Sequence, residues 1–580
     1  MVNLIWVIKH FGMDKNSYIL GLSFGYHDSA AAIIQNGKVV CAVEEERFTG
    51  KKHDNSFPTN SIKWVCEYLN ISLTDIPVVC YYEDPSLKRS RIKSFAWKYF
   101  FKSPLQSLSA IFSREESIEV LLKEKLHEDI KVVLGNHHLS HQAYSYLTSD
   151  FTDSAIITVD GVGEYETITM SKGEGNKLKP IQSVKYPHSL GMLYSSFTSF
   201  LGFKPNEGEY KVMGLAPYGN HERYIDELKK LYTLKYDGSF ELNMDYFTYH
   251  YSDTEMFNTK LSELFGLPNR LPEEELTQEH KDLAAGLQFI YEYLFFRLLN
   301  RLYEQTECKN LCIGGGCAYN GTANGKIKSN TQFQNVWIPP APSDAGSAIG
   351  CALGWFHATF PLEPRKENTT PFLGPDQTAE EINKELQMWD FKVDYELIVD
   401  NKLIPKVAQL ISEGNIIGWV DGRLEFGARA LGNRSILADP RDPQMKKRVN
   451  MVVKKREGFR PFAPIVCGDE KQNYFTPPID IPYMNQIVHV KDRHVDSLPA
   501  ITHVDGSSRV QTLYQSFNKR MYRLLKQYKE ITGYPILLNT SFNLKDQTMV
   551  RDTREALQTF MSCDMDYLVV GNFLVSKKIF

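Results

Sequence analysis

The stretch that decides the fold lies close to the N-terminus, where residues 18–43 read YILGLSFGYHDSAAAIIQNGKVVCAV. The apolar run over 18–23 predicts a β-strand, and the turn-rich Gly25-Tyr26-His27-Asp28-Ser29 follows it. Two more apolar runs flank Asn36-Gly37, a dipeptide typical of tight β-hairpins. The sequence therefore predicts a strand, a polar loop and a hairpin in succession.

The same plan recurs between residues 155 and 184. Apolar residues 155–159 precede Asp160-Gly161-Val162-Gly163, and a second hairpin pattern turns at Gly173-Glu174-Gly175-Asn176. Repetition of such a unit indicates an internal duplication, and a duplicated α/β fold can hold a nucleotide between its lobes. Coincidence between two ordinary hairpins is the alternative.

Length and composition restrict the class of protein. At 580 residues the chain exceeds a single hydrophobic core, so we expect two or more domains. With 66 basic and 70 acidic residues, it has no global attraction to nucleic acid or to an anionic membrane, and any anion site must be local. Nine cysteines without a Cys-Xaa-Xaa-Cys pair indicate reduced thiols, so we expect a cytoplasmic protein.

The N-terminal residues give no strong targeting pattern. The apolar run from Leu4 to Ile8 is too short for a signal peptide, and no stretch reaches the length of a transmembrane helix. We expect residues 1–12 to be a peripheral extension ahead of the first strand.

Apolar periodicity and proline content predict the domain organisation. The residues from Pro361 to Pro375 hold four prolines and little periodicity, so they read as a linker. We therefore expect one domain over residues 13–360 and a second α/β domain over 376–580. Helices are expected at 62–69, 118–126, 283–304, 444–454 and 513–528, and strands of the second domain at 416–420, 465–466, 536–538 and 567–570.

Two histidines in Gly135-Asn136-His137-His138-Leu139-Ser140-His141 stand four residues apart and share one face of a helix. Such a pair forms half of a metal site. Asp160 and Asp344, both at glycine turns, supply carboxylates for the other half. A shell of two histidines and two aspartates suits iron, manganese or zinc. The alternative is a helix whose histidines are polar or capping residues.

Two glycine-bracketed loops are candidates for contact with a nucleotide. Gly314-Gly315-Gly316-Cys317-Ala318-Tyr319-Asn320 follows a short apolar run, so its backbone amides can approach a phosphate or ribose. It matches neither a P-loop nor a dinucleotide fingerprint. Residues 206–214 form a similar loop with charges inside it. A tight turn and a solvated loop remain the plain alternatives.

Basic residues accumulate between Arg423 and Arg460. Arg429, Arg434 and Arg460 stand among small and apolar residues, so their guanidinium groups need anionic partners. The planar guanidinium group suits phosphate, which favours a phosphate pocket here. A basic solvated helix describes residues 446–448 better.

His27 lies in the first predicted loop. An imidazole titrates close to neutral pH, so His27 is a candidate base for an attacking hydroxyl, or else a hydrogen-bonded turn residue. Lys51-Lys52-His53 either binds a ligand or decorates a surface loop.

Taken together, these motifs resemble the O-carbamoyltransferases of the nodulation-protein-U and cephalosporin-carbamoyltransferase family, nearly from end to end. Ser541 stands where the family sometimes supplies another basic group, and residues 236–278 match nothing assignable. The matching blocks are residues 25–30, 45–48, 136–141, 160–161, 209–216, 314–320, 342–346, 426–441, 456–464 and 538–543.

The resemblance implies a fold and a reaction. It implies a duplicated N-terminal domain of the actin-like ATPase superfold, similar to the tRNA-threonylcarbamoyl-transferring protein, and a YrdC-like C-terminal domain. Carbamoyl phosphate and ATP then give carbamoyl adenylate, whose carbamoyl group passes to a hydroxyl of a small natural product in the first domain. A closed path between domains protects this anhydride from water.

The resemblance also assigns site residues and cofactors. It implies Fe²⁺, with manganese or zinc as alternatives, Mg²⁺ with ATP, a homodimer, and His27 as the catalytic base. The implied metal ligands are His137, His141, Asp160 and Asp344; the nucleotide residues are Glu209, Gly214, Gly315, Gly316 and Asn320; and the carbamoyl-phosphate residues are Arg429, Lys454, Arg460, Arg509 and Asn539.

Three rival functions remain open. An actin-fold small-molecule kinase explains the duplicated hairpins and the glycine loop but leaves the arginines without a role. A metallohydrolase lacks the glutamate of His-Glu-Xaa-Xaa-His. An RNA-binding module conflicts with the near-neutral charge. The resemblance implies a small hydroxyl acceptor as partner and leaves its identity open, and the near-neutral charge leads us to expect neither nucleic acid nor membrane.

Overall fold

The computed structural model describes residues 12–112, 117–454, 460 and 462–578, without the side chains of 452 and 454. These residues form two compact units. The first unit contains residues 30–40 and 65–369 together with the N-terminal part up to Gly25. The second contains 370–580 together with 26–29 and 41–64. The chain passes between units inside the predicted linker, whereas the loop of His27 groups with the second unit.

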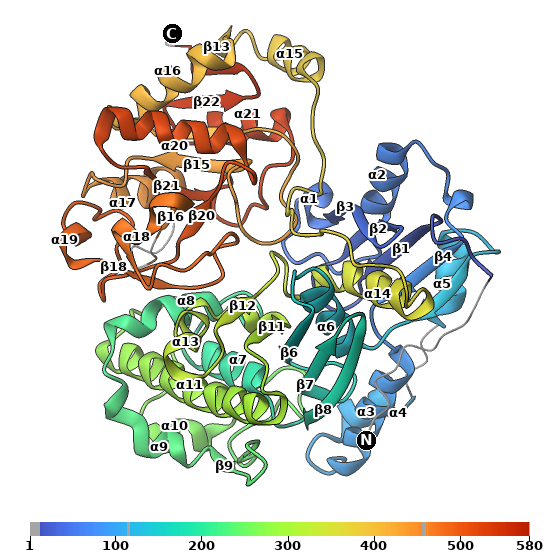
Figure 1. Cartoon of the computed structure of the whole chain (residues 1–580). Helices are drawn as coiled ribbons and strands as arrows, with labels where there is room; N and C mark the ends of the chain where they lie inside the picture. The colour runs from blue at the N-terminus through green and yellow to red at the C-terminus, as the bar shows by residue number, and fades with distance from the viewer. Residues whose placement is uncertain (1–11, 113–116, 455–459, 461, 579–580) are drawn as a thin grey trace. The chain divides into compact units, whose positions relative to one another are not determined.

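A five-stranded sheet opens the chain (Figure 1). Its order is β3-β2-β1-β4-β5, in which β1 pairs antiparallel with β2 and parallel with β4. The predicted Asn36-Gly37 turn joins β2 to β3. The strands are β1 (Tyr18–Ser23), β2 (Ala30–Gln35), β3 (Lys38–Glu44), β4 (Val78–Tyr81) and β5 (Lys131–Leu134).

A second five-stranded sheet repeats this topology. Its order is β12-β11-β6-β7-β8, with β6 antiparallel to β7 and parallel to β11. Two sheets with the same order and strand directions are the product expected of a duplication, which agrees with the repeated hairpin pattern. The strands are β6 (Asp153–Val159), β7 (Glu166–Glu174), β8 (Lys177–Lys185), β11 (Asn310–Gly314) and β12 (Asn335–Trp337).

Helices α6 and α14 pack against each other in the first unit. Glycine makes this close approach possible, because a Cβ at Gly350 of α14 would lie 1.9 Å from the carbonyl oxygen of Ser140 in α6. The helices before residue 369 are α1 (Glu46–Thr49), α2 (Thr59–Leu69), α3 (Pro85–Lys98), α4 (Pro104–Phe112), α5 (Ile118–Lys125), α6 (His137–Leu147), α7 (Leu190–Phe200), α8 (Glu209–Leu215), α9 (Ile225–Lys229), α10 (Thr259–Phe265), α11 (Gln278–Thr306), α12 (Gly321–Gly325), α13 (Ile327–Asn330) and α14 (Asp344–Thr359).

The second unit is built on an eight-stranded sheet of order β13-β23-β22-β14-β15-β21-β16-β20. Apolar side chains cover both faces of this sheet in two separate clusters. Its strands are β13 (Val393–Leu397), β14 (Ile417–Val420), β15 (Arg434–Ala438), β16 (Ala463–Cys467), β20 (Gln511–Leu513), β21 (Ile536–Ser541), β22 (Tyr567–Val570) and β23 (Phe573–Lys577). The longer helices are α15 (Ala379–Met388), α16 (Asp400–Ser412), α20 (Lys519–Thr532) and α21 (Thr553–Met561).

The prediction of a mixed α/β fold is confirmed, and one predicted helix was placed wrongly. Leu513 belongs to β20, where it pairs with Cys467 of β16. The helix expected at 513–528 instead begins at Lys519, because Asn518 caps it by accepting the backbone N–H of Met521 at 3.0 Å. Within the described residues, no helix combines the length and the apolar character needed to cross a membrane.

His357, on α14, makes the stability of the first unit depend on pH. The ring is buried and packs against Phe356. Burial lowers the pKa of His357 to about 4, and the charge of Arg365 acts in the same direction. Between pH 6.5 and 4 the unfolded chain therefore binds the extra proton, so the free energy of unfolding falls as the pH falls, by about 3 kcal/mol in total.

We expect His357→Leu to remove this dependence, measured as the slope of unfolding free energy against pH in chemical denaturation. The same replacement at exposed His489 serves as control and should leave the slope unchanged. Equal slopes for the wild type and the His357 variant would contradict the assignment.

Candidate metal centre and anion-binding edge

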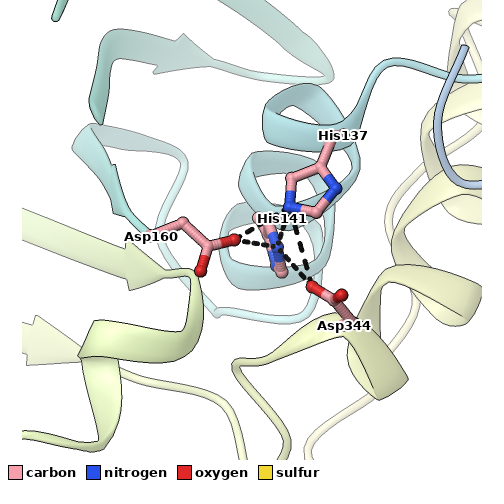
Figure 2. A group of neighbouring side chains, drawn as sticks. All are labelled: His137, His141, Asp160 and Asp344. Carbon is pink, nitrogen blue, oxygen red and sulfur yellow. Dashed lines mark hydrogen bonds and ion pairs between the residues drawn. The ribbon is translucent and has the colours of Figure 1, made fainter. Parts of the chain in front are cut away.

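The histidine pair lies on α6, which is buried along its whole length. Asn136 caps this helix, because its Oδ1 accepts the backbone N–H of Leu139 at 3.0 Å. One helical turn separates His137 from His141, and their Nε2 atoms lie 3.2 Å apart (Figure 2). Both imidazoles therefore point to one place, as the spacing of four residues predicts.

Two aspartates reach the same place from other elements. Asp160 follows β6, and Asp344 is the first residue of α14. Asp160 Oδ2 lies 2.8 Å from His137 Nε2 and 3.2 Å from His141 Nε2. Asp344 Oδ1 lies 3.6 and 3.3 Å from the same two nitrogens. Figure 2 shows the four side chains converging, so the structure brings together all four residues predicted as metal ligands.

Further polar side chains hold the two imidazoles from behind. Ser347 Oγ lies 3.1 Å from His141 Nδ1, and Glu83 Oε2 lies 3.7 Å from His137 Nδ1. Glu164 accepts the backbone N–H of His137 at 2.9 Å. Sequence reasoning missed these three residues. Glu83 follows the end of β4, a parallel strand, which was a usable signal, but the other two become apparent only from contacts in three dimensions.

The electrostatics of the cluster favour a bound cation. Burial by itself lowers the pKa of His137, but the charge of Asp344 and the hydrogen bond with Asp160 outweigh it and hold the pKa well above its ordinary value. Burial likewise raises the pKa of Asp160, yet hydrogen bonds with His137 and His141 hold it well below its ordinary value. The carboxylates thus attract positive charge into a buried site, which protons or a cation can supply.

The four side chains fit a divalent metal ion. Each offers one ligand atom, and these atoms all lie within 4.8 Å of one another. Two imidazole nitrogens and two carboxylate oxygens form a donor set that iron, manganese and zinc accept. Ser347 Oγ supplies the outer hydrogen-bond partner of His141 Nδ1, whereas Glu83, 3.7 Å from His137 Nδ1, contributes negative charge but no hydrogen bond.

Two of the predicted nucleotide residues adjoin the metal cluster. The backbone N–H of Gly316 donates to Asp160 Oδ1 at 3.3 Å. Gly315 adopts φ +89°, and a Cβ there would lie 2.3 Å from the carbonyl oxygen of Val159. Only glycine accepts both the conformation and this contact. The glycine triplet therefore helps to position Asp160.

The other predicted nucleotide residues contact neighbouring helices. Glu209, at the start of α8, accepts Ser195 Oγ at 2.6 Å, and Gly214 lies within the same helix. Asn320 caps α12, and its Oδ1 also accepts Gln288 Nε2 at 3.1 Å. The first contact joins α7 to α8, and the second joins α11 to the start of α12.

Four of the five predicted carbamoyl-phosphate residues lie on strands of the second unit's sheet or shortly before them. Strand β21 is antiparallel to β15 and β16, and β16 is parallel to β20. The starts of β15, β16 and β20 therefore lie at the edge where β21 ends. Arg429, Arg460 and Arg509 precede these three strands, and Asn539 lies on β21 opposite both Leu437 and Ala463.

Asn539 is buried at this edge and connects two of its segments. Its Nδ2 donates to the carbonyl oxygen of Ala430 at 3.3 Å and to Gln511 Oε1 at 3.0 Å. Its Oδ1 accepts no hydrogen bond from the residues that the structure describes. A buried amide oxygen in this condition suits a ligand that carries an N–H group.

The arginine run needs one correction. Arg434 does not face a phosphate pocket, because its buried guanidinium donates to the carbonyl oxygens of Asp421 and Gly422 at 3.0 Å each and of Arg551 at 3.2 Å. Carbonyl oxygens therefore accept the hydrogen bonds of the Arg434 guanidinium, for which the sequence predicted an anionic partner. Lys454 ends the helix Val449–Lys454, and its side chain lies outside the described part of the chain.

Buried acidic residues hold the loop around Arg429 in place. Glu44 Oε1 accepts the backbone N–H of Gly427 at 2.6 Å, and Arg47 Nη2 donates to the carbonyl oxygen of Gly427 at 2.9 Å. Glu425 Oε1 accepts the N–H groups of Leu431 and Asn433, at 2.8 Å each. These hydrogen bonds fix the backbone of the loop at Gly427, Leu431 and Asn433.

His27 forms a cluster that the sequence indicated only in part. Asp28 accepts from two imidazoles, with Oδ2 2.9 Å from His27 Nδ1 and Oδ1 2.7 Å from His53 Nδ1. These two hydrogen bonds, together with the charges, hold the pKa of Asp28 below its ordinary value even though burial raises it. Asp28 and His53 both have positive φ, 46° and 53°, which is uncommon outside glycine and frequent at functional sites.

Comparison with family models covers most of the chain. A model described as the carbamoyltransferase N-terminus matches residues 18–353, and one described as the carbamoyltransferase C-terminus matches residues 408–577. The two matches leave the proline-rich segment between them.

Several known proteins are similar to the chain over nearly its full length. A protein of unknown function from Synechocystis sp. is 41% identical over 97% of both chains. Nodulation protein NolNO from Sinorhizobium fredii is 36% identical over 98% of this chain and 81% of its own length. Among solved structures, component A of (R)-2-hydroxyglutaryl-CoA dehydratase from Acidaminococcus fermentans aligns with 59% of this chain and 99% of its own, at 14% identity and a TM-score of 0.34.

Proposed function

Since the chain belongs to the carbamoyltransferase family and is a transferase enzyme, we propose that it makes carbamoyl adenylate from carbamoyl phosphate and ATP and carbamoylates a hydroxyl of a small natural product. Atom balance requires one water: carbamoyl phosphate gives carbamate and orthophosphate, and the carbamate oxygen attacks the α-phosphorus of ATP with loss of pyrophosphate. The acceptor oxygen then attacks the carbamoyl carbon, and AMP leaves.

In this proposal the two units have different folds and divide the work. The repeated 3-2-1-4-5 strand order of the first unit supports an actin-like ATPase fold, and we assign the second unit as YrdC-like. Adenylate formation is assigned to the second unit, and the residues that would hold a metal ion belong to the first. In this proposal residues 13–360 form the transfer domain and residues 376–580 the adenylate-forming domain, while residues 26–29 and 41–64 group with the second unit.

The observation that carries the proposal is the strand register, which brings Asn539 and the starts of β15, β16 and β20 to one edge of the sheet, and Arg429, Arg460 and Arg509 precede these strands. A dianionic phosphate needs several cationic groups, and arginine binds it through paired hydrogen bonds. The carbamoyl group adds an NH₂, which matches the acceptor oxygen of Asn539. Lys454 is proposed as a further cation of this site, and Ser541, at the end of β21, supplies a hydroxyl at the same edge.

His137, His141, Asp160 and Asp344 would hold Fe²⁺, with Mn²⁺ or Zn²⁺ as substitutes. When bound, such an ion supplies positive charge to a phosphate group and polarises its oxygens. Gly315 and Gly316 fix the backbone beside Asp160, and Glu209, Gly214 and Asn320 are proposed to shape the nucleotide site, with Mg²⁺ accompanying ATP.

His27 is proposed as the base that takes the proton of the acceptor hydroxyl. By donating Nδ1–H to Asp28, the ring is held in the tautomer whose Nε2 accepts a proton. His53 binds the other oxygen of the same carboxylate and so fixes its orientation. The pairing of Nδ1 with Asp28 supports a general-base role for His27.

The decisive experiment incubates the protein with labelled carbamoyl phosphate, ATP and a panel of sugar, aminoglycoside, polyketide and alkaloid acceptors. Carbamoyl transfer predicts a mass gain of one carbamoyl group on an acceptor, with pyrophosphate and AMP as products. A small-molecule kinase, the rival, would release ADP and phosphorylate the acceptor. Release of ADP without carbamoylation would overturn the proposal.

We expect Arg460→Ala to lower the formation of carbamoyl adenylate by about 100-fold or more, since it removes a cation from the anion-binding edge. The measurement is exchange of labelled pyrophosphate into ATP in the presence of carbamoyl phosphate. Arg493→Ala, which removes an exposed arginine of the same unit, is the control and should retain exchange. Normal exchange in the Arg460 variant would exclude its assigned role.

A further inference from the structure

Helices α3 and α4 pack against each other as a helical hairpin (Figure 1), and three ring contacts join its inner face to other residues of the first unit. The guanidinium of Arg91 lies over the ring of Tyr186, 4.7 Å from its centroid, and Phe95 packs edge-on against the same ring. Tyr99 contacts His250 edge-on. These contacts fix the hairpin on the body of the unit, so its outer face is a defined surface.

The outer face is unusually apolar. Trp97, Phe101 and Leu105 surround the turn of the hairpin and are 67%, 96% and 84% exposed. The exposure of several large apolar side chains to water is unfavourable. A soluble protein that exposes a contiguous apolar patch commonly uses it to bind a partner or a membrane. The other exposed apolar residues of the two helices are Leu87, Ile92, Leu108 and Phe112.

The same segment is strongly basic in a chain of net charge −4. Residues 85–112 contain no aspartate or glutamate. Two exposed lysines flank the aromatic turn, with Lys98 Nζ 5.3 Å and Lys102 Nζ 5.7 Å from the ring centroid of Tyr99. The basic residues of the segment are Lys88, Arg89, Arg91, Lys93, Lys98 and Lys102.

We propose that the α3–α4 hairpin docks on an anionic lipid surface, with Trp97, Phe101 and Leu105 in the interfacial layer and the lysines at the headgroups. Tryptophan, phenylalanine and leucine beside lysine are the composition of interfacial anchors, and anionic lipid attracts nearby basic residues. We expected no membrane partner because basic and acidic residues nearly balance over the whole chain. The hairpin is a local basic cluster, which that overall balance does not describe.

Charge also decides against the other apolar occupant, a second copy of the chain. A twofold contact through this face would bring two basic segments close together, and residues 85–112 contain no acid to neutralise them. An anionic surface neutralises all of them at once. The hairpin is therefore complementary to a bilayer and poorly complementary to itself.

The test is sedimentation of the full chain with vesicles of phosphatidylcholine alone or mixed equally with phosphatidylglycerol. We expect binding to the anionic vesicles, weakened at high salt. Trp97→Ser/Phe101→Ser/Leu105→Ser should lower the binding constant by at least about tenfold. Lys98→Gln/Lys102→Gln should lower it by about fivefold per lysine.

Tyr236→Ser/Leu362→Ser is the matched control, since Leu362 is 97% exposed in the same unit but outside the hairpin. It should bind as the wild type does. Circular dichroism verifies that each variant is folded, and light scattering records the oligomeric state. The proposal is overturned if the wild type ignores anionic vesicles, if the triple variant binds equally well, or if the triple variant merely converts a dimer to a monomer. Vesicle binding is independent of carbamoyl transfer, so the two proposals fail separately.

Discussion

Replacing His137 with alanine is expected to strip the metal from the purified protein and to lower carbamoyl transfer by more than about 100-fold. Loss of an outer partner of a ligand typically costs 10- to 100-fold in metal affinity or activity, so loss of a ligand should exceed that range. The remaining His141, Asp160 and Asp344 would share a cation with one donor fewer. Elemental analysis measures the metal, and product formation measures transfer.

The neighbouring His138 offers a matched control. It is buried on the same helix, but its Nδ1 lies 3.1 Å from Thr169 Oγ1, so its ring is directed to a different partner. His138→Gln should keep the metal. The metal content of Ser347→Ala should lie between those of His138→Gln and His137→Ala, because Ser347→Ala removes only the partner of His141 Nδ1. Full metal content in the His137 variant would refute the metal centre.

His27→Asn is expected to lower carbamoyl transfer by about 10²- to 10⁴-fold, the usual contribution of a general base, while carbamoyl adenylate still forms. The asparagine retains polarity but cannot accept the proton of the acceptor. Pyrophosphate exchange should therefore persist, and carbamoyl adenylate should accumulate or hydrolyse. Following both half-reactions in the same sample separates a lost base from a damaged adenylate site.

Two companion variants sharpen this result. Asp28→Asn retains the ring of His27 but removes the acceptor of its Nδ1–H, so transfer should fall less than in His27→Asn and its pH profile should shift. His53→Asn loses only the second contact to Asp28 and should have a smaller effect. If His27→Asn loses pyrophosphate exchange as fully as Arg460→Ala does, the division of roles is wrong.

The sequence correctly predicted those features that a few consecutive residues determine. The spacing of His137 and His141 places both rings on one helical face, and the Asn36-Gly37 turn forms a hairpin whatever surrounds it. Apolar periodicity likewise located the long helix α11. These features are set by a few consecutive residues, so a pattern in the chain suffices to predict them.

Other features depend on contacts between distant residues and escaped prediction. Asp28 pairs with His53, and Glu44 accepts the backbone N–H of Gly427. Ser347 is the outer partner of His141. Arg434 looked like a phosphate ligand because a buried guanidinium needs acceptors, and sequence alone cannot distinguish an anion from loop carbonyl oxygens. Leu513 reads equally well as the start of a helix or the end of a strand until its pairing with Cys467 is known.

Two glycines of α14 let this helix lie close to its neighbours beside the candidate metal centre. Gly350 meets the carbonyl oxygen of Ser140, and a Cβ at Gly346 would lie 2.0 Å from the carbonyl oxygen of Ala341. A side chain at either position would have to displace backbone beside the helix that carries Asp344, and so would move this carboxylate relative to the histidines. The spacing of the candidate ligands thus depends partly on two residues that are not ligands themselves.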